Sequence, residues 1–191
     1  MSDSLSSVSP LDGRYAAKTA EIQRYCSEGA LIGYRVQVEA YWVRFLIRED
    51  IFGYEVPARV LQCIEDLIAN VPEDLVQRVK EFEKTTNHDV KAVEYALQER
   101  LKQAGAHQKV LALVHFACTS EDINNAAYGL MLKDLQNRVV LPTLSKLIKT
   151  LGRHVETYAA SPMLSRTHGQ PATPTTMGKE LAVFAARLLR V

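Results

Sequence analysis

Apolar residues recur every three or four positions along most of the chain. This spacing places side chains on one face of an amphipathic helix, and the segment from Leu31 to Leu46 is the clearest case. No stretch shows the alternation of apolar and polar residues between turns that predicts a hairpin. The pattern therefore predicts an all-α fold. The core-facing stripe predicted for this first long helix is Leu31, Tyr34, Val38, Tyr41, Trp42, Phe45 and Leu46.

Three shorter helices are predicted after this segment. Pro57 and Pro72 each stand at the head of a periodic stretch, where the missing N–H of proline costs no hydrogen bond. A further helix is predicted from Val90 to Gln103, and Gly105 follows it as a residue suited to a helix C-terminus.

The last third of the chain predicts two long helical stretches. One begins at Thr119 or Ser120, and Pro142 within it predicts a kink or a division into two helices. The last begins near Pro174 with Thr173 as its N-cap, and its pattern continues to the final residue. We therefore expect the sequence to be the front part of a longer protein.

Composition excludes some classes of function. The 191 residues include 47% hydrophobic ones, enough for one or two domains with a core. With 23 basic and 22 acidic residues the net charge is +1, which disfavours nucleic acid as a partner. The stretch MSDSLSSVSP lacks secretory features, and the longest apolar run, VLALVHFAC, is shorter than the roughly 20 residues of a membrane span. We expect a cytoplasmic protein with no membrane or nucleic-acid partner. Three cysteines without a C-x-x-C spacing favour neither disulfides nor zinc.

Polar residues gather between the predicted helices at four places. In SPLDGRY a turn presents Arg14 and Tyr15, and a guanidinium suits a phosphate or carboxylate. In EKTTNHDVKAVEY, Asn87, His88 and Asp89 stand at a helix start, where free N–H groups attract anions. The simpler interpretation of this second cluster is a cap, formed by Asn87 or Asp89, with His88 incidental.

The other two clusters complete the set. ACTSEDINN places Thr119 and Ser120 at a helix N-terminus, and SRTHGQPATP places Thr167 and His168 in a loop of small residues. Histidine is the side chain that most readily exchanges protons near neutral pH. Together the four clusters predict a pocket for a ligand with several anionic groups and one acid–base residue. A non-catalytic helical interaction module, with these clusters as caps, remains an alternative.

The same segments resemble a known family. SRTHGQPATPTTMGKE resembles the histidine signature of the fumarase/aspartase superfamily, while SPLDGRY, TTNHDVKAVEY and HFACTSEDINN resemble the bacterial type of the adenylosuccinate lyase family. The resemblance extends from about Val8 to Glu180. It implies an N-terminal helical domain at residues 1–117 and the beginning of a central helix bundle at residues 118–191. It also implies a homotetramer whose active sites are shared among subunits.

The resemblance further implies a reaction, the β-elimination of fumarate from succinyl-purine nucleotides, with no metal or organic cofactor. His168 would be the general acid. Arg14 and Tyr15 would bind the phosphate end of the substrate, and Thr119 and Ser120 a succinyl carboxylate.

The remaining candidate residues would line the pocket. Asn87, His88 and Asp89 would line it, with His88 positioning the substrate rather than exchanging the main proton, and Thr167 lies beside the proposed acid. The serine-containing loop that supplies the base in this family has no counterpart in the sequence, so we expect the 191-residue chain alone to be inactive. Argininosuccinate lyase and the carboxymuconate cycloisomerases remain alternatives within the superfamily.

Overall fold

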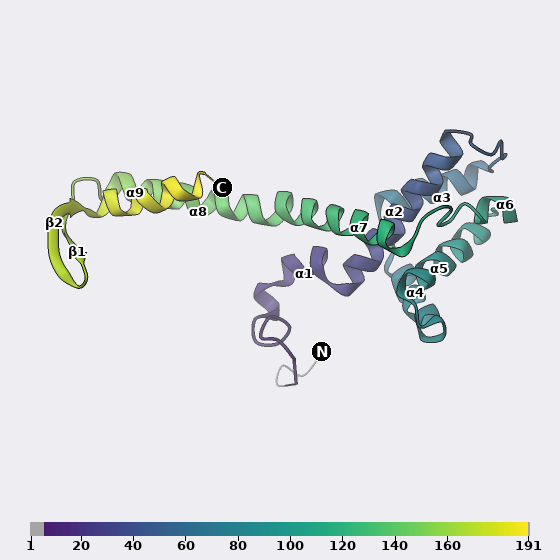
Figure 1. Ribbon diagram of the computed structural model, residues 1–191, viewed down its shortest axis with the longest axis horizontal. Coiled ribbons are helices and arrows are strands. Elements are labelled where there is room, and N and C mark those ends of the chain that lie inside the picture. The colour runs from purple at the N-terminus through teal and green to yellow at the C-terminus, as the bar shows by residue number, and fades with distance from the viewer. Residues whose placement is uncertain (1–5, 191) are drawn as a thin grey trace. The chain divides into compact units, whose positions relative to one another are not determined.

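The structure is a computed structural model, of which residues 6–190 are described (Figure 1). Residues 1–5 of the polar N-terminal stretch, and Val191 at the end of the last predicted helix, lie outside the described residues. The chain divides into two compact units, Met1–Leu135 and Gln136–Val191. The domain boundary between residues 117 and 118, which the family resemblance implies, refers to the whole protein and stays a prediction.

The first unit is helical, as the pattern predicted. Among the described residues, its long helices are α2, α3, α4, α5 and α7, and η1, α1 and α6 are short (Figure 1). The bounds are η1 Ala16–Lys18, α1 Ala20–Cys26, α2 Glu28–Arg48, α3 Ala58–Ala69, α4 Glu73–Thr86, α5 Asp89–Gln103, α6 Gln108–Leu111 and α7 Ser120–Leu135.

Several helix ends confirm the sequence analysis. Pro57 and Pro72 directly precede α3 and α4. Gly105 has a φ of +96° and follows α5, where its N–H donates to the carbonyl of Lys102. The next N–H, of Ala106, donates to the carbonyl of Leu101, which completes the paired bonds that close a helix at a left-handed glycine.

The buried face of α2 differs from the predicted one. Of the predicted stripe only Leu46 is buried, while Tyr41 and Phe45 are exposed. Because α2 carries apolar residues around most of its circumference, periodicity alone permits two stripes, and the smaller side chains occupy the crowded centre of the unit. The large rings of Trp42 and Phe45 instead stack on each other near the surface. The buried residues of α2 are Ile32, Arg35, Val36, Glu39, Ala40, Val43 and Leu46.

The core of the first unit contains buried residues of α2, α3, α4 and α5, and α2 also packs against α7. The apolar face predicted for α5 is confirmed, because Val90, Val93, Leu97 and Leu101 are all buried. Two charged side chains of α2 lie within this core, and they are described with the site below. None of the helices at residues 6–190 is long and apolar enough to cross a membrane.

The second unit contains two helices and a hairpin. A π-helical turn at Gln136–Val140 precedes α8, so the expected division near Pro142 is confirmed. Strands β1 and β2 pair in antiparallel order, with an irregularity in register between Leu164 and Arg166. The remaining bounds are α8 Leu141–Thr157, β1 Pro162–Thr167, β2 Gln170–Thr176 and α9 Met177–Leu188.

The hairpin corrects two expectations. The sequence predicted no strands, whereas the structure contains β1 and β2. Most of their side chains are exposed, so the two strands show no alternation of apolar and polar residues that would have predicted them. Pro174 lies in β2, and α9 begins later, where the hydroxyl of Thr176 accepts the N–H of Lys179 at 3.2 Å. The overall class, a mostly helical fold with one small sheet, is the one predicted.

Candidate functional site

His168 lies at the tip of the β1–β2 hairpin. Thr167 pairs with Gln170, so the connecting loop consists of His168 and Gly169, with φ values of +50° and +75°. Positive φ at both central residues defines the tight turn that matches the twist of paired strands. The side chain of His168 is exposed. Thr167 is also exposed and is the last residue of β1.

The base of the hairpin is fixed to the helices of its own unit. The N–H of Met177 donates to the carbonyl of Ser161 at 3.0 Å, and that of Gly178 donates to the carbonyl of Tyr158 at 2.9 Å. Thr175 donates its hydroxyl to Glu180 at 3.1 Å. The hydrogen bond from Lys179, followed by that from Thr175, lowers the pKa of the Glu180 carboxyl. These bonds hold the strand ends that carry His168.

The cap of α5 is His88, which corrects the predicted cap at Asn87 or Asp89. His88 Nδ1 accepts the N–H of Lys91 at 3.2 Å. Asn87 ends α4 instead, in the left-handed conformation with a φ of +50°. Since Nδ1 is the acceptor, a neutral His88 carries its proton on Nε2 and offers it as a donor. His88 is therefore part of the local structure, and its exposed ring can also contact a ligand.

Asp89 joins α5 to two other helices through Arg35. Arg35 is 5% exposed; it donates from Nη2 to Asp89 at 2.7 Å and from Nε to Asn124 of α7 at 2.9 Å. Asp89 also accepts the N–H of Val90 at 2.9 Å. Burial opposes the charge on Asp89, but the Val90 bond and Arg35 outweigh it and lower the pKa of the carboxyl. The structure thus brings the starts of α5 and α7 together around one guanidinium.

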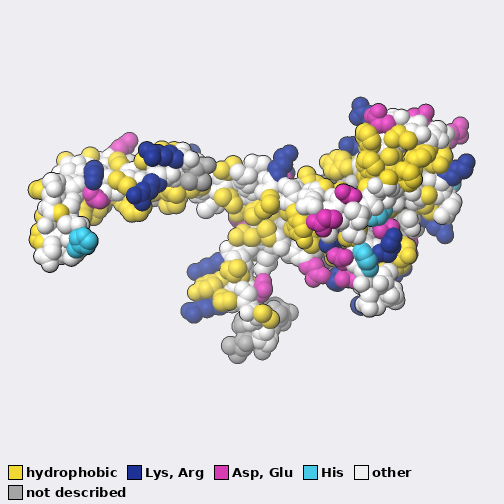
Figure 2. All heavy atoms as spheres, in the orientation of Figure 1, with side chains coloured by type: hydrophobic (Ala, Val, Ile, Leu, Met, Phe, Trp, Pro, Cys, Tyr) yellow, Lys and Arg dark blue, Asp and Glu magenta, His cyan; other side chains and the backbone are white. Residues whose placement is uncertain are grey.

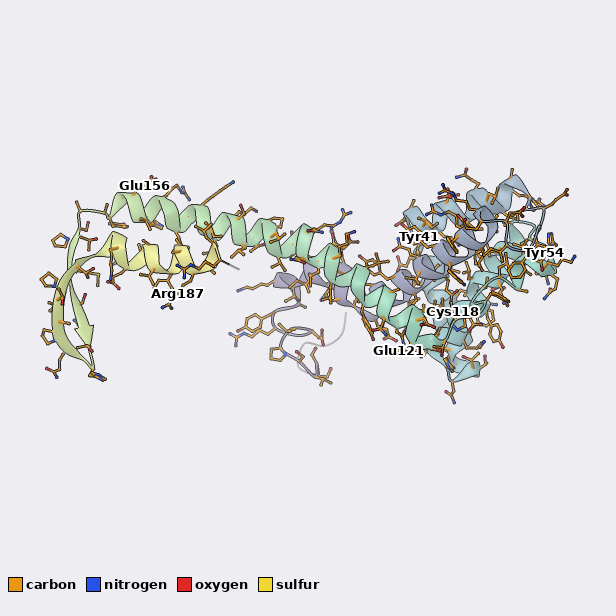
Figure 3. The ribbon with its side chains drawn as sticks, turned by 45° about the horizontal axis from the view of Figure 1, so that its top comes forward. Tyr41, Tyr54, Cys118, Glu121, Glu156 and Arg187 are labelled. Atoms are coloured by element: carbon orange, nitrogen blue, oxygen red, sulfur yellow. The ribbon has the colours of Figure 1, made fainter. Side chains whose placement is uncertain are left out.

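Thr119 and Ser120 lie where α7 begins. Ser120 is the first residue of the helix, and the backbone N–H of Thr119 donates to the Asp122 carboxylate at 2.8 Å. Figure 3 labels Cys118 before this helix and Glu121 in its first turn. Thr119 is exposed and Ser120 is half-buried, so both hydroxyl groups are at or near the surface.

Arg14 and Tyr15 lie on the predicted turn. Its backbone is closed by the N–H of Tyr15, which donates to the carbonyl of Pro10 at 2.8 Å. The Arg14 guanidinium lies 5.7 Å from the centre of the Tyr15 ring, as does the ammonium of Lys18. Arg14 and Lys18 are both exposed and give this segment a local positive charge.

The sequence analysis missed a buried pair, Glu39 and His115. Glu39 is fully buried, and Oε1 accepts from His115 Nδ1 at 2.6 Å while Oε2 accepts the backbone N–H of His115 at 2.9 Å. One turn further along α2, Trp42 Nε1 donates to the carbonyl of Phe116 at 2.8 Å. The sequence does contain one signal for a buried carboxylate: Glu39 shares a helix face with Val36 and Val43, and the predicted stripe did not include that face.

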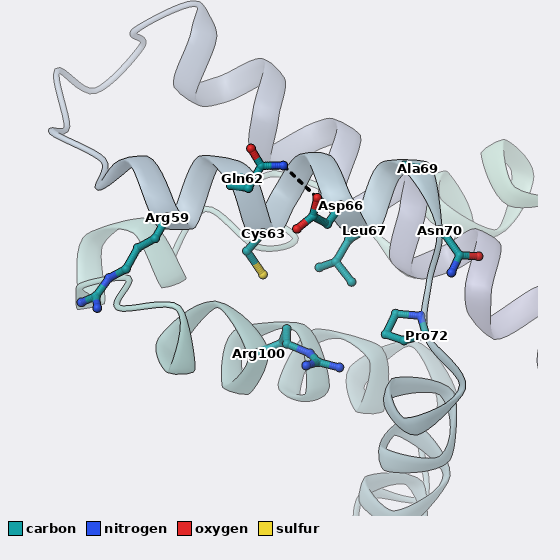
Figure 4. A pocket seen from close by; sticks show the side chains of 9 residues that line it. All are labelled: Arg59, Gln62, Cys63, Asp66, Leu67, Ala69, Asn70, Pro72 and Arg100. Atoms are coloured by element: carbon teal, nitrogen blue, oxygen red, sulfur yellow. Dashed lines mark hydrogen bonds between the residues drawn. The ribbon is translucent and has the colours of Figure 1, made fainter.

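A surface cavity of about 630 Å³ lies between α3 and α5 (Figure 4). Its lining includes Arg59, Cys63 and Arg100, and Arg100 is already paired with Asp74 at 2.7 Å. Burial raises the pKa of the Cys63 thiol. The cavity contains none of the predicted site residues. Among residues 6–190 no group of three or more His, Cys, Asp or Glu is arranged to hold a metal ion.

The profile of the lyase family matches residues 13–190, so the chain belongs to this family. Among curated relatives, the chain is 49% identical over 189 residues to the adenylosuccinate lyase of Legionella pneumophila strain Philadelphia 1. It is 45% identical over 190 residues to the adenylosuccinate lyase of Escherichia coli K12. These matches cover 97% and 98% of this chain but 41% of each relative, so the chain spans about two fifths of their length.

Solved structures show the same fold at lower identity. The fumarate lyase from Mesorhizobium sp. BNC1 is 22% identical with a TM-score of 0.71, and the match covers 90% of this chain and 38% of that one. The 3-carboxy-cis,cis-muconate lactonizing enzyme from Pseudomonas putida is 23% identical with a TM-score of 0.69, with 90% and 37% covered. At this identity the likeness concerns the fold alone, and the fold is the all-α type that the sequence predicted.

Proposed function

We propose that this chain is part of an adenylosuccinate lyase. The whole protein would eliminate fumarate from adenylosuccinate to leave AMP, and from the succinyl-aminoimidazole-carboxamide ribotide of purine nucleotide synthesis. The observation that carries the proposal is the identity of 45–49% to adenylosuccinate lyases over 97–98% of this chain. The four polar clusters all fall within that stretch.

In the proposed reaction a base removes a proton from the carbon next to a substrate carboxylate. The C–H electron pair forms the new C=C bond, the C–N bond breaks, and the departing nitrogen takes the bonding pair and a proton from an acid. His168 is that acid. Its place at an exposed, anchored hairpin tip supports the role, because a positioned imidazole can reach a ligand there without rearranging a core.

The binding roles follow the chemistry of the exposed groups. Arg14 and Tyr15 bind the phosphate end, since a free guanidinium forms paired hydrogen bonds with phosphate oxygens. Thr119 and Ser120 bind a succinyl carboxylate with hydroxyl groups and with the N–H groups at the start of α7.

The other candidates line the pocket. His88 contributes an Nε2–H donor, and Asn87 precedes it in a left-handed turn. Asp89 fixes the start of α5 through Arg35, and Thr167 lies beside the acid. The base comes from a part of the enzyme outside this sequence.

The proposal includes a cytoplasmic homotetramer that shares its active sites, with domains at residues 1–117 and from residue 118. The second unit supports an assembly because none of the α8 residues, Leu141–Thr157, is buried. Figure 2 shows hydrophobic side chains on the surface of this unit. Leu147 is 48% exposed and Phe184 is 58% exposed, and a helix bundle between subunits would cover such side chains.

The test is fumarate release by the full-length protein. We expect turnover with adenylosuccinate and none with argininosuccinate or carboxymuconate, each at matched concentrations. Elimination from argininosuccinate alone would reassign the enzyme within the superfamily. No turnover with any of the three, together with no binding of AMP or fumarate, would favour the non-catalytic module. Sedimentation of the same sample measures the tetramer, and cell fractionation measures the location.

A further inference from the structure

The starting observation is a carboxylate in the core of the first unit. Glu39 has no exposed surface, yet both of its oxygens accept hydrogen bonds, and both donors belong to His115. Burial raises the pKa of Glu39, and the bonds from His115 offset part of that effect. A buried carboxyl group is costly unless its partners are fixed, so this pair defines one geometry of the surrounding backbone.

The backbone that Glu39 holds is strained. His115 and Ala117 have φ values of +59° and +58°, the left-handed region that residues with a Cβ rarely adopt. This conformation is unfavourable for a residue with a Cβ, and it persists only where neighbouring groups impose it. Two residues of α2 do so here, Glu39 through its two bonds and Trp42 through its bond to Phe116.

The strained turn leads directly into the start of α7. The N–H of Cys118 donates to the carbonyl of His115 at 3.2 Å, and Thr119 and Ser120 follow. Burial raises the pKa of the Cys118 thiol, and the negative charges of Glu39 and Asp122 raise it further. The position of the two hydroxyl residues relative to α2 therefore depends on the turn that Glu39 fixes.

The pair also fixes the ring of His115. An ionised Glu39 carboxylate can only accept, so Nδ1 of His115 carries the proton in the bond between them. Nε2 then lies on the other side of the ring, 3.7 Å from Oε1 of Glu94, and the other oxygen of Glu94, Oε2, accepts from Lys91 at 2.7 Å. The ring cannot turn over without losing its bond to Glu39.

We propose that Glu39 is a positioning residue for the binding of the substrate's succinyl carboxylate: acting through His115, it sets the turn that places Thr119 and Ser120. This inference rests on the proposed function, which assigns those two residues to that carboxylate.

The test uses Glu39→Gln in the full-length enzyme. Glutamine keeps the shape of glutamate, but its NH₂ group must face either the backbone N–H or Nδ1–H of His115. One accepted bond is thereby lost, or His115 must give up its Nδ1 proton. We expect the KM for adenylosuccinate and the inhibition constant of fumarate to rise roughly 10-fold or more, the loss typical when an orienting partner is removed. The inhibition constant of AMP should stay within about twofold, because AMP lacks the succinyl group. A general loss of fold would instead raise the constants of both fumarate and AMP.

Two further variants test the route of the effect. Glu65→Gln removes an exposed carboxylate that also pairs with α2, through Arg44 at 3.0 Å, and should leave all three constants unchanged. In a His115→Gln background, adding Glu39→Gln should change the fumarate constant by less than about twofold, because Glu39 acts through His115. If Glu39→Gln does not fold, Trp42→Phe serves in its place, because it removes the other bond from α2 to the turn. This variant should raise the inhibition constant of fumarate but not that of AMP.

The outcomes separate the two proposals. A folded Glu39→Gln enzyme with a wild-type fumarate constant overturns the positioning role, as do equal losses for fumarate and AMP, or full additivity with His115→Gln. In each of these cases an active wild-type enzyme leaves the proposed function standing. A wild-type protein without turnover of adenylosuccinate overturns the proposed function and this inference together.

Discussion

Replacing Gly178 with alanine should displace the hairpin that carries His168. Gly178 is buried near the start of α9, where this helix meets the end of α8. A Cβ at this position would lie 2.5 Å from the carbonyl oxygen of Val155 and 2.7 and 2.8 Å from Cα and N of Ala159. All three are backbone atoms, so no side-chain rotation can relieve the overlap. Since Cβ contacts shorter than 3.0 Å essentially never occur, α9 must move by roughly 0.5–1 Å.

The size of the effect follows from this overlap. Overpacking of this kind costs about 1–3 kcal/mol, and the better helix propensity of alanine returns at most about 1 kcal/mol. We expect a net loss of about 1–2 kcal/mol in the free energy of unfolding. Strand β2 ends at Thr176, directly before α9, so the same movement reaches the hairpin. A misplacement approaching 1 Å lowers kcat by about 10²-fold where a positioned acid takes part.

The assay compares kcat and the urea midpoint of Gly178→Ala with those of the full-length wild type. Gly152→Ala is the matched control, because it also adds one methyl group to a helix of the same unit. An added Cβ at Gly152 meets no described atom within 4 Å, so stability should rise by up to about 1 kcal/mol and kcat should stay unchanged. Wild-type kcat and stability in Gly178→Ala would refute the reasoning that this contact positions His168.

Four other predictions concern the proposed roles. His168→Ala in the full-length enzyme should lower kcat by roughly 10²-fold or more with an unchanged circular dichroism spectrum, and wild-type turnover would remove His168 from the mechanism. Arg14→Ala should weaken substrate binding but hardly change fumarate binding, as measured by calorimetry; equal losses would make Arg14 structural. Because folding lowers the pKa of Asp89, its ionised form adds stability above about pH 4. The difference in urea midpoint between wild type and Asp89→Asn should therefore shrink as the pH falls through the pKa of folded Asp89. A difference that stays constant with pH would contradict this. The 191-residue chain alone should release fumarate far more slowly than about 1 s⁻¹, and faster release would place the base within this sequence.

How well the fold could be predicted depended on how one-sided each helix is. In α5 the apolar residues Val90, Val93, Leu97 and Leu101 form a single stripe, and all of them are buried. In α2 apolar residues occur on most sides, so the spacing did not distinguish the buried face. The aromatic residues were misleading there, because large rings can remain half-exposed and stack at the surface while valine and alanine fill the close contacts between helices.

The hairpin could not be predicted from hydrophobic pattern, because its strands cover no core within their own unit. The turn chemistry gave a weaker signal. His168 and Gly169 occupy the two positive-φ positions where asparagine and glycine are more usual, and histidine is among the side chains enriched in that conformation. The histidine proposed as the acid is also one that fits a tight turn, so the loop that the sequence singled out as a candidate site was also the turn that it did not predict.

Arg35 and Glu39 show why a stability argument alone is insufficient for the buried charges of α2. They lie four residues apart on the core-facing side, and each links this helix to the beginning of another segment, Arg35 to α5 and α7 and Glu39 to the turn before α7. Replacing buried ion pairs with apolar residues of similar volume is often neutral or stabilising by about 1–4 kcal/mol, so the core itself does not require them. What apolar side chains cannot do is fix direction, because hydrophobic contact has no preferred angle, whereas a guanidinium or carboxylate holds its partners at set distances. These two residues orient the helix starts that carry His88, Thr119 and Ser120. The buried charges of α2 therefore help to place the proposed substrate contacts.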